Sequence, residues 1–402
     1  MKKDFFLNFI AVALPIGVLQ LGILPVVNFI VGNSSYGLIV SLIAVLNAIP
    51  VAMGNSLCNT RQLMEGLYLK QRVVGDFNLL LVLISTAGFA ISLFCAGVYG
   101  YGWFDAMLLG VCGGIMAVYN YQIVAFRLDL NFRGMLAANA LVAAAMLVGM
   151  VLFLAAGCWQ LVFIIGYAAG SVYVACRTNV MRGGIKRSPL WRDTCKVEGA
   201  LLFSLLLSGL VNYGDRLILL PLQGSVAVSI FYIASLVGKL LVMVISPMST
   251  VVLSYVVRTD AVDKKSTFKL MGISSVIGLA FWILTIVLAP TVLGVLYPSE
   301  MNQAVLYVPL VTAVSVLQAQ CSLLNPTIMR FYSAKWQVLC NALALGVLLV
   351  GGFLLSEAFG LMGFCAACLL STLSKFLLIC TLIFIFKSSS AYESLAPEKK
   401  ED

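Results

Sequence analysis

The sequence predicts an all-α membrane protein with about twelve transmembrane helices in two six-helix bundles. Hydrophobic residues make up 62% of the 402 residues, and charged residues make up only 10%. The chain therefore has far more apolar surface than a soluble core can bury, and lipid is expected to be its main solvent. Its apolar runs are about 20 residues long and do not alternate as barrel strands do, which indicates helices that pair their backbone polar groups internally.

The apolar runs form two sets separated by a polar, basic segment. The first set predicts spans at residues 5–31, 36–57, 77–99, 103–124, 135–156 and 159–176. The second set predicts spans at residues 200–222, 226–257, 270–296, 304–329, 336–356 and 360–386. We thus expect an N-terminal bundle at 1–176, a cytoplasmic basic linker at 177–199, a C-terminal bundle at 200–386 and a disordered cytoplasmic tail at 387–402.

Lysine and arginine are confined to one side of the predicted spans. Of the 25 in the chain, 22 fall in segments on that side, three lie inside spans, and none falls in a loop on the other side. Because basic loops are retained on the cytoplasmic face, we expect a multi-pass protein of the bacterial inner membrane with both termini in the cytoplasm. The net charge of +9 is explained by this orientation and by anionic lipid headgroups, so we expect no nucleic-acid partner.

The residue types that carry most enzyme and metal chemistry are absent or poorly placed. The chain has no histidine, and its eleven cysteines lie mostly within spans, with Cys365 and Cys368 as the only close pair. It has no phosphate-binding loop, no nucleophile elbow and no paired carboxylates outside the bilayer. We therefore expect no enzyme activity, no metal site and no cofactor.

Three basic residues lie inside predicted spans, and all three belong to the C-terminal bundle: Arg216, Lys239 and Lys375. Each costs about 2.5 to 3.5 kcal/mol if it sits near the bilayer centre. At 1.5 Å per residue, Arg216 lies about 24 Å from the inner surface of a core about 30 Å thick, whereas the two lysines fall in the inner half. They predict a path for an anionic group, but long side chains can also carry such charges to the headgroups by snorkelling.

Uncharged polar residues inside the spans offer further candidates for a cavity lining. They can hydrogen-bond a substrate, for example the hydroxyl groups of a sugar, or they can hold helices together. Asp215 is also a candidate, because it can neutralise its neighbour Arg216. The full set is Asn47, Tyr119, Asn120, Gln122, Asn212, Asp215, Gln318, Gln320 and Asn325.

Local motifs in the seventh and eighth predicted spans resemble those of the polysaccharide flippases of the multidrug/oligosaccharidyl-lipid/polysaccharide (MOP) exporter superfamily. A similar likeness follows the fourth span, in the predicted inner loop. The residues that carry the resemblance are Gly209, Asn212, Tyr213, Asp215, Arg216, Pro221, Phe231, Tyr232, Ser235, Gly238, Lys239, Ser246 and Pro247, with Phe126, Arg127, Asp129, Asn131 and Phe132 in the inner loop.

The resemblance implies a flippase for undecaprenyl-diphosphate-linked oligosaccharide, the repeat unit of O-antigen lipopolysaccharide or capsule. Arg216, Lys239 and Lys375 would then hold the diphosphate, and other polysaccharide assembly proteins would be partners. The bundles are expected to rock against each other, giving access to each leaflet in turn.

Two other functions remain open from the sequence. A MATE-type drug/cation antiporter of the same superfamily typically carries an acidic residue in its first helix, and residues 5–31 contain none. An O-antigen polymerase characteristically presents a large outer loop, whereas the longest predicted one here is 297–303.

Overall fold

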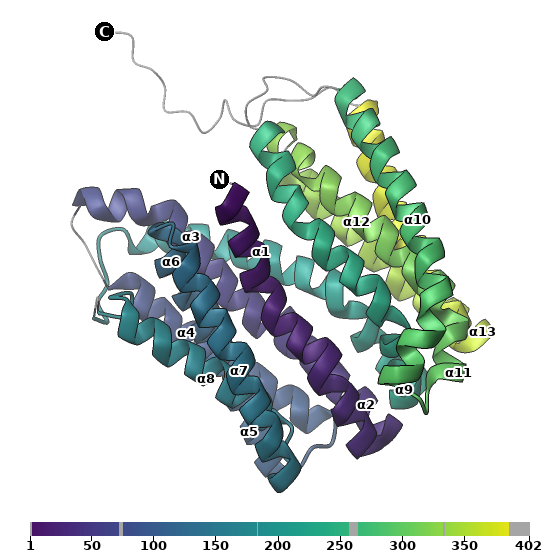
Figure 1. The fold of residues 1–402 in the computed structure, drawn as a ribbon. Helices are drawn as coiled ribbons and strands as arrows, with labels where there is room; N and C mark the ends of the chain where they lie inside the picture. Colours follow the sequence, from purple (N-terminus) through teal and green to yellow (C-terminus); the bar gives the residue numbers. More distant parts are fainter. Residues whose placement is uncertain (1, 72–74, 183, 257–263, 333, 386–402) are drawn as a thin grey trace. The chain divides into compact units, whose positions relative to one another are not determined.

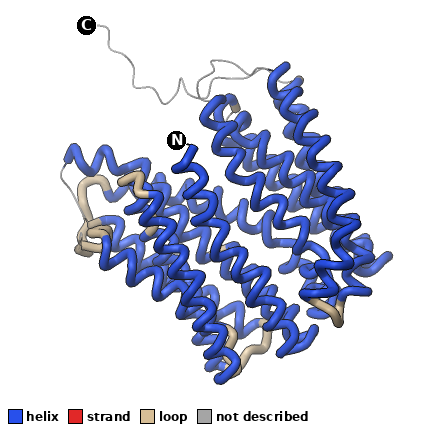
Figure 2. Tube along the Cα trace, viewed as in Figure 1, coloured by secondary structure: helices blue, strands red, loops and turns tan. Residues whose placement is uncertain are grey.

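The computed structural model describes residues 2–71, 75–182, 184–256, 264–332 and 334–385. The predicted tail at 387–402 lies outside these residues. Throughout the described ranges the regular structure is helical, with loops between the helices and no strand (Figure 2). The predicted all-α fold class is therefore confirmed.

The chain divides into two compact units, Met1–Leu217 and Ile218–Asp402. The division falls inside the predicted seventh span, so the first unit includes the predicted linker. The helices are labelled in Figure 1. The first unit contains α1 (Lys2–Gly17), the π-helical turn η1 (Val18–Ile23), α2 (Leu24–Ala48), α3 (Pro50–Gln71), α4 (Asp76–Val98), α5 (Trp103–Gln122), α6 (Val124–Leu128), α7 (Phe132–Ala156), α8 (Gln160–Arg177) and the first part of α9 (Trp191–Val256). The second contains the rest of α9, α10 (Lys264–Leu296), α11 (Met301–Ala304), the 3₁₀ turn η2 (Val305–Tyr307), α12 (Val308–Phe331) and α13 (Ala334–Phe384).

Three glycines break the longest helical stretches at the predicted boundaries between spans. Gly32, Gly224 and Gly360 have φ angles of 76°, 80° and 57°, which glycine adopts at little cost because it has no Cβ atom. The stretches that they interrupt are 63, 49 and 49 residues long, whereas one crossing needs only about 20. The described residues hold nine apolar helical stretches of sufficient length, and counting these three as two crossings each gives the twelve that the sequence predicts.

Helix α7 shows how the sequence fixes the ends of a span. At its start, the Asn131 side chain accepts a hydrogen bond from the backbone N–H of Gly134 at 2.9 Å, which satisfies one otherwise unpaired donor of the first turn. At its end, Gly157 has a φ of 75°, the left-handed conformation that terminates many helices. The 25 residues between them extend about 37 Å, enough to cross the apolar core of a bilayer.

Close approach of α7 and α8 depends on glycines. A Cβ atom added to Gly166 would lie 2.6 Å from the Met146 side chain, and one added to Gly149 would lie 2.7 Å from the Cα atom of Val162. Neither distance leaves room for a side chain, so these helices pack backbone to backbone as small residues allow in membranes.

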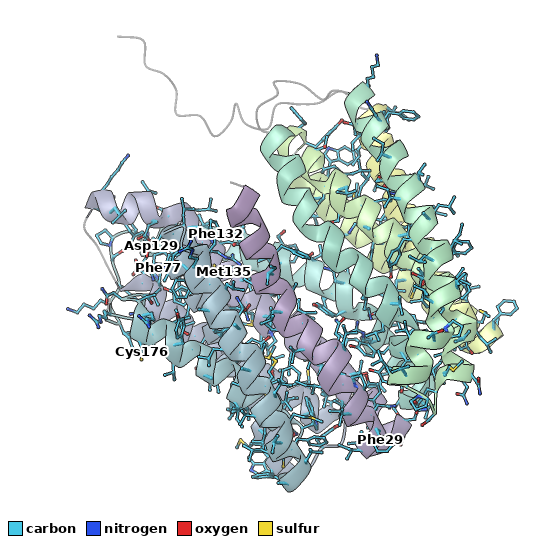
Figure 3. The ribbon with its side chains drawn as sticks, in the orientation of Figure 1. Phe29, Phe77, Asp129, Phe132, Met135 and Cys176 are labelled. Atoms are coloured by element: carbon cyan, nitrogen blue, oxygen red, sulfur yellow. The ribbon has the colours of Figure 1, made fainter. Side chains whose placement is uncertain are left out.

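The ends of the first unit can be followed in Figure 3. Phe77 at the start of α4, Asp129 in the loop before α7 and Cys176 near the end of α8 lie toward one end of the unit, and Phe29 lies toward the other. The start of α4, the loop before α7 and the end of α8 therefore lie toward one end of the first unit. The charge pattern of the sequence predicts that this end faces the cytoplasm.

Candidate functional site

Arg216 is a buried residue of α9 near the end of the first unit. It is 5% exposed, and its guanidinium carbon lies 5.7 Å from the centroid of the Tyr213 ring, three residues earlier on α9. Its Nε atom lies 3.9 Å from the Asp215 carboxylate, which also accepts a hydrogen bond from the Arg216 backbone N–H at 2.8 Å. The side chain is thus held among polar and aromatic groups, and its burial argues against snorkelling to the headgroups.

Lys239 lies on α9 in the second unit and turns back along its own helix. Its Nζ atom donates a hydrogen bond to Ser235 Oγ at 2.6 Å and lies 4.7 Å from the centroid of the Tyr232 ring. Both partners precede it by one or two helical turns, so the amine points toward the start of this crossing. Close to it, a Cβ atom added to Gly238 would lie 2.5 Å from the Ser315 Oγ atom of α12, so the backbones of the two helices approach closely here.

Lys375 lies on α13 in the second unit, half-buried beside a cysteine-containing core. It is close enough to Cys321 of α12 and to Cys340 of α13 to interact with both electrostatically. These two cysteines belong to a cluster of buried apolar residues that includes Leu324, Ile328 and Leu382. In the described part of the chain, no carboxylate is close enough to Lys375 to offset its charge.

Asn47 and Asn120 use their side-chain amides within their own helices. Asn47 Nδ2 donates to the carbonyl oxygen of Ile43 at 2.8 Å, and Asn120 Nδ2 donates to that of Met116 at 2.8 Å. A bond to the carbonyl four residues earlier is a common way for a polar side chain to be accommodated in a helix.

Tyr119 belongs to a set of aromatic and polar residues contributed by four helices of the first unit. Its hydroxyl donates to Asn139 Oδ1 on α7 at 3.1 Å, and its ring centroid lies 5.4 Å from that of Tyr167 on α8. Tyr167 lies near Tyr213 of α9, the residue whose ring faces Arg216. The four residues form a continuous set of three aromatic rings and one amide next to Arg216. The sequence predicted Tyr119 as a cavity residue and singled out Tyr213 through the family resemblance, but it gave no sign of Asn139 or Tyr167.

The remaining predicted residues have varied surroundings. Gln122 is buried, and its Oε1 atom has no hydrogen-bond donor among the described residues, whereas Asn212 is exposed. Gln320 is 5% exposed and links α12 to α10, because its Oε1 atom accepts a hydrogen bond from Ser274 Oγ at 2.5 Å. Gln318 and Asn325 are half-buried on the same helix.

A shallow apolar groove of about 410 Å³ lies on the second unit between α10, α12 and α13. Gly278, Leu279, Trp282, Val316, Gln320 and Phe376 contribute to its wall. Trp282 is held there by a hydrogen bond of 2.8 Å from its indole N–H to the carbonyl oxygen of Pro309.

A buried carboxylate, which no pattern in the sequence indicated, attaches the predicted linker to the first unit. Asp76 of α4 is fully buried and accepts hydrogen bonds from the Tyr68 hydroxyl at 2.6 Å, from the backbone N–H of Ser188 at 2.7 Å and from the Ser188 hydroxyl. Asn78, two residues later, donates to the carbonyl oxygens of Met181 and Gly184 at 3.0 Å each. The basic side chains of the linker are exposed around this anchored loop.

A second buried carboxylate lies where the linker continues into α9. Glu198 is 4% exposed, and its two carboxylate oxygens lie 2.5 Å from Ser56 Oγ and 2.6 Å from Thr60 Oγ1, both on α3. The hydroxyls are one helical turn apart and present a matched pair of partners to the carboxylate. A carboxylate in a predicted polar linker reads as a surface charge, and the spacing of Ser56 and Thr60 is the only sequence signal that could have pointed to it.

Solved structures of membrane transporters match this fold, although no family model matches the sequence and no curated protein matches it significantly. An inward-facing multidrug resistance MATE family transporter of the MOP superfamily matches with a TM-score of 0.69 and 13% identity over 99% of this chain and 96% of that chain. The lipid II flippase MurJ in an inward closed conformation matches with a TM-score of 0.63 and 12% identity over 90% and 94%. A MOP superfamily transporter from Pyrococcus furiosus matches with a TM-score of 0.64 and 14% identity over 95% and 96%. The chain therefore has the fold of MATE and MOP transporters.

Proposed function

We propose that this protein is a transporter that moves undecaprenyl-diphosphate-linked oligosaccharide repeat units from the inner to the outer leaflet of a bacterial inner membrane. These repeat units would serve O-antigen or capsule assembly, and the proteins that build and join them would be its partners. The single observation that carries the proposal is the set of three cations inside predicted spans, of which Arg216 is buried and Lys239 is directed along its own helix.

The balance of charge within the spans supports an anionic substrate. The predicted spans contain only two acidic residues, Asp105 at the edge of one span and Asp215 beside Arg216. Charged residues inside a membrane are costly, so three cations with so few acidic neighbours are best explained by a substrate that brings negative charge. A diphosphate fits this requirement, because guanidinium and ammonium groups bind phosphate oxygens through charge-assisted hydrogen bonds.

The fold supports transport by alternating access. In transporters built from two repeated bundles, the substrate path lies between the halves, and one bundle moves against the other. The diphosphate would be held by the cations, the polar side chains would contact the sugars, and the lipid tail would stay in the bilayer. A membrane potential that is negative inside favours outward movement of an anion by about 2.3 kcal/mol per charge per 100 mV.

A MATE-type drug/cation antiporter is the second candidate, because several structural neighbours are MATE transporters. A carboxylate is the residue that neutralises a cationic drug, and the only carboxylate well inside a predicted span, Asp215, lies beside a buried arginine. The first predicted span, at residues 5–31, carries no acidic residue for ion coupling. These observations favour the flippase over the antiporter.

Deletion of the gene in the native host tests the proposal. The flippase function predicts loss of surface polysaccharide together with complete lipid-linked repeat units stranded on the cytoplasmic side of the membrane. Intact polysaccharide with altered drug tolerance would instead establish the antiporter. Single repeat units accumulating on the outer side would indicate a polymerase.

A further inference from the structure

The pairing of Glu198 with two hydroxyls in the first unit has no place in the transport path proposed above. Glu198 is the eighth residue of α9, beyond the first turn in which a carboxylate is stabilised by the helix dipole. It is therefore not an N-terminal cap. Ser56 and Thr60 are both fully buried, so all three side chains are withdrawn from solvent.

The charged and titratable groups on the surrounding elements are engaged elsewhere. Arg61 of α3 donates to the Tyr121 hydroxyl of α5 at 2.5 Å and pairs with Glu65, and Arg127 of α6 donates to the Cys58 sulfur at 3.4 Å. Asp76 of α4 is bound by Tyr68 and Ser188. Cys195 of α9 is a further titratable neighbour of Glu198, and the nearby cation Arg187 lies over the Trp191 ring, 5.2 Å from its centroid. In the described part of the chain, no cation therefore offsets the charge of Glu198, and burial without a cation favours the neutral form of a carboxyl group.

The donors and acceptors around Glu198 can satisfy both its ionised and its protonated form. Ser56 Oγ lies 2.8 Å from the carbonyl oxygen of Met53 as well as 2.5 Å from Glu198, but a hydroxyl group has only one proton to donate. When Glu198 is ionised, Ser56 and Thr60 both donate to the carboxylate. When Glu198 is protonated, it donates to Ser56, and Ser56 rotates to donate to Met53 while Thr60 still donates to Glu198.

We propose that Glu198 is a reversible proton-binding site, in which the Ser56 hydroxyl switches its hydrogen bond between Glu198 and Met53. The proton comes from water and binds one carboxylate oxygen, with no other bond made or broken. Protonation removes a buried charge at the junction between α3 and α9, two helices of the first unit. If the protein is the transporter proposed above, this site couples the proton gradient to its movement.

Infrared difference spectroscopy of the purified full-length protein between acid and alkaline pH tests the site without any substrate. A protonated carboxyl group in a buried site gives its own carbonyl band. We expect such a band to appear on acidification of the wild type, to be lost in Glu198→Gln and to remain in Asp193→Asn, which changes an exposed carboxylate five residues earlier. A spectrum of Glu198→Gln identical to that of the wild type would overturn the proposal.

A second variant keeps the test independent of whether Glu198→Gln folds. Thr60→Val removes one donor to the ionised carboxylate and conserves volume, so the band of Glu198 should titrate at higher pH. If the Glu198 band of Thr60→Val titrates at the same midpoint pH as that of the wild type, Thr60 does not donate to the ionised carboxylate and the proposed site is wrong. These measurements use no lipid-linked substrate. They therefore test the proton-binding site even if the protein proves not to transport that substrate. In vesicles that transport the substrate, an imposed pH gradient should change the rate for the wild type but not for Glu198→Gln.

Discussion

The Lys239 amine lies 4.7 Å from the centroid of the Tyr232 ring, two helical turns earlier on α9. Ser235, between them, accepts a hydrogen bond from the same amine at 2.6 Å. Both contacts direct the charge away from the end of the crossing that the sequence predicts to be cytoplasmic. The amine therefore does not follow the snorkelling path to the inner headgroups, and we propose that it contacts the anionic group of the substrate.

Lys239→Gln should reduce transport at least about tenfold while leaving the amount of protein in the membrane unchanged, because a hydrogen bond to a charged group contributes about 1.5 to 3 kcal/mol. The matched control is Lys269→Gln, which removes the same charge from an exposed position on α10. Transport per molecule and membrane abundance should be measured together. A parallel fall in both would show that Lys239 serves folding.

Gly170→Ala should destabilise the first unit by about 1 to 3 kcal/mol, the usual cost of overpacking. The added Cβ atom would lie 2.6 Å from the Tyr119 ring and would also overlap the Val142 side chain. Gly97→Ala is the control, because a Cβ atom at Gly97 meets nothing within 4 Å and alanine favours a helix. Thermal unfolding of the purified variants should show a lower midpoint for Gly170→Ala only. Equal midpoints would mean that α5, α7 and α8 separate more easily than the structure indicates.

Asp76→Asn should loosen the linker. Asparagine would present an N–H group in place of one carboxylate oxygen, toward the Tyr68 and Ser188 donors. A buried donor that loses its acceptor lowers the free energy of unfolding by about 1 to 3 kcal/mol. Cleavage by trypsin after Lys186 or Arg187 should become several-fold faster, because proteolysis requires local opening of the chain. Asp193→Asn, which changes an exposed carboxylate, should leave the cleavage rate as it is. Equal rates for the two variants would contradict the anchoring role of Asp76.

Gln320→Leu distinguishes residues that hold helices together from residues that line a cavity. Its side chain bridges α12 to Ser274 of α10, so its loss should lower stability by about 1 kcal/mol without changing transport per molecule. Gln318→Leu, on the same helix, should have the opposite pattern if Gln318 lines the substrate path. A selective loss of transport in Gln320→Leu would place this residue among the substrate contacts instead.

The spans and their boundaries were predictable because lipid imposes a simple rule on length and polarity. The sequence segmentation places breaks at 32–35, 223–225 and 357–359, and the structure has left-handed glycines at Gly32, Gly224 and Gly360, within or next to those breaks. The count of about twelve crossings follows from the same rule.

The surroundings of the candidate residues were harder to predict, since they depend on side-chain direction. Residue spacing predicted a depth for Arg216 but not the Tyr213 ring beside it, and it gave no sign that Asn47 bonds within its own helix. Glu198 was missed for a different reason. Its burial is created by α3, more than 130 residues earlier in the chain, and a polar linker sequence carries no trace of that contact.

The proposed transport can be measured directly as flipping of the substrate in vesicles that contain only the purified protein. Lipid-linked oligosaccharide extracted from the deletion strain would be placed in one leaflet, and its exposure in the other followed with a membrane-impermeant glycosidase. We expect rapid exposure with the wild type and with Lys269→Gln, and exposure no faster than in protein-free vesicles with Arg216→Gln and Lys239→Gln. Exposure at the protein-free rate with the wild type, in vesicles that do transport a cationic dye, would contradict the proposed transport.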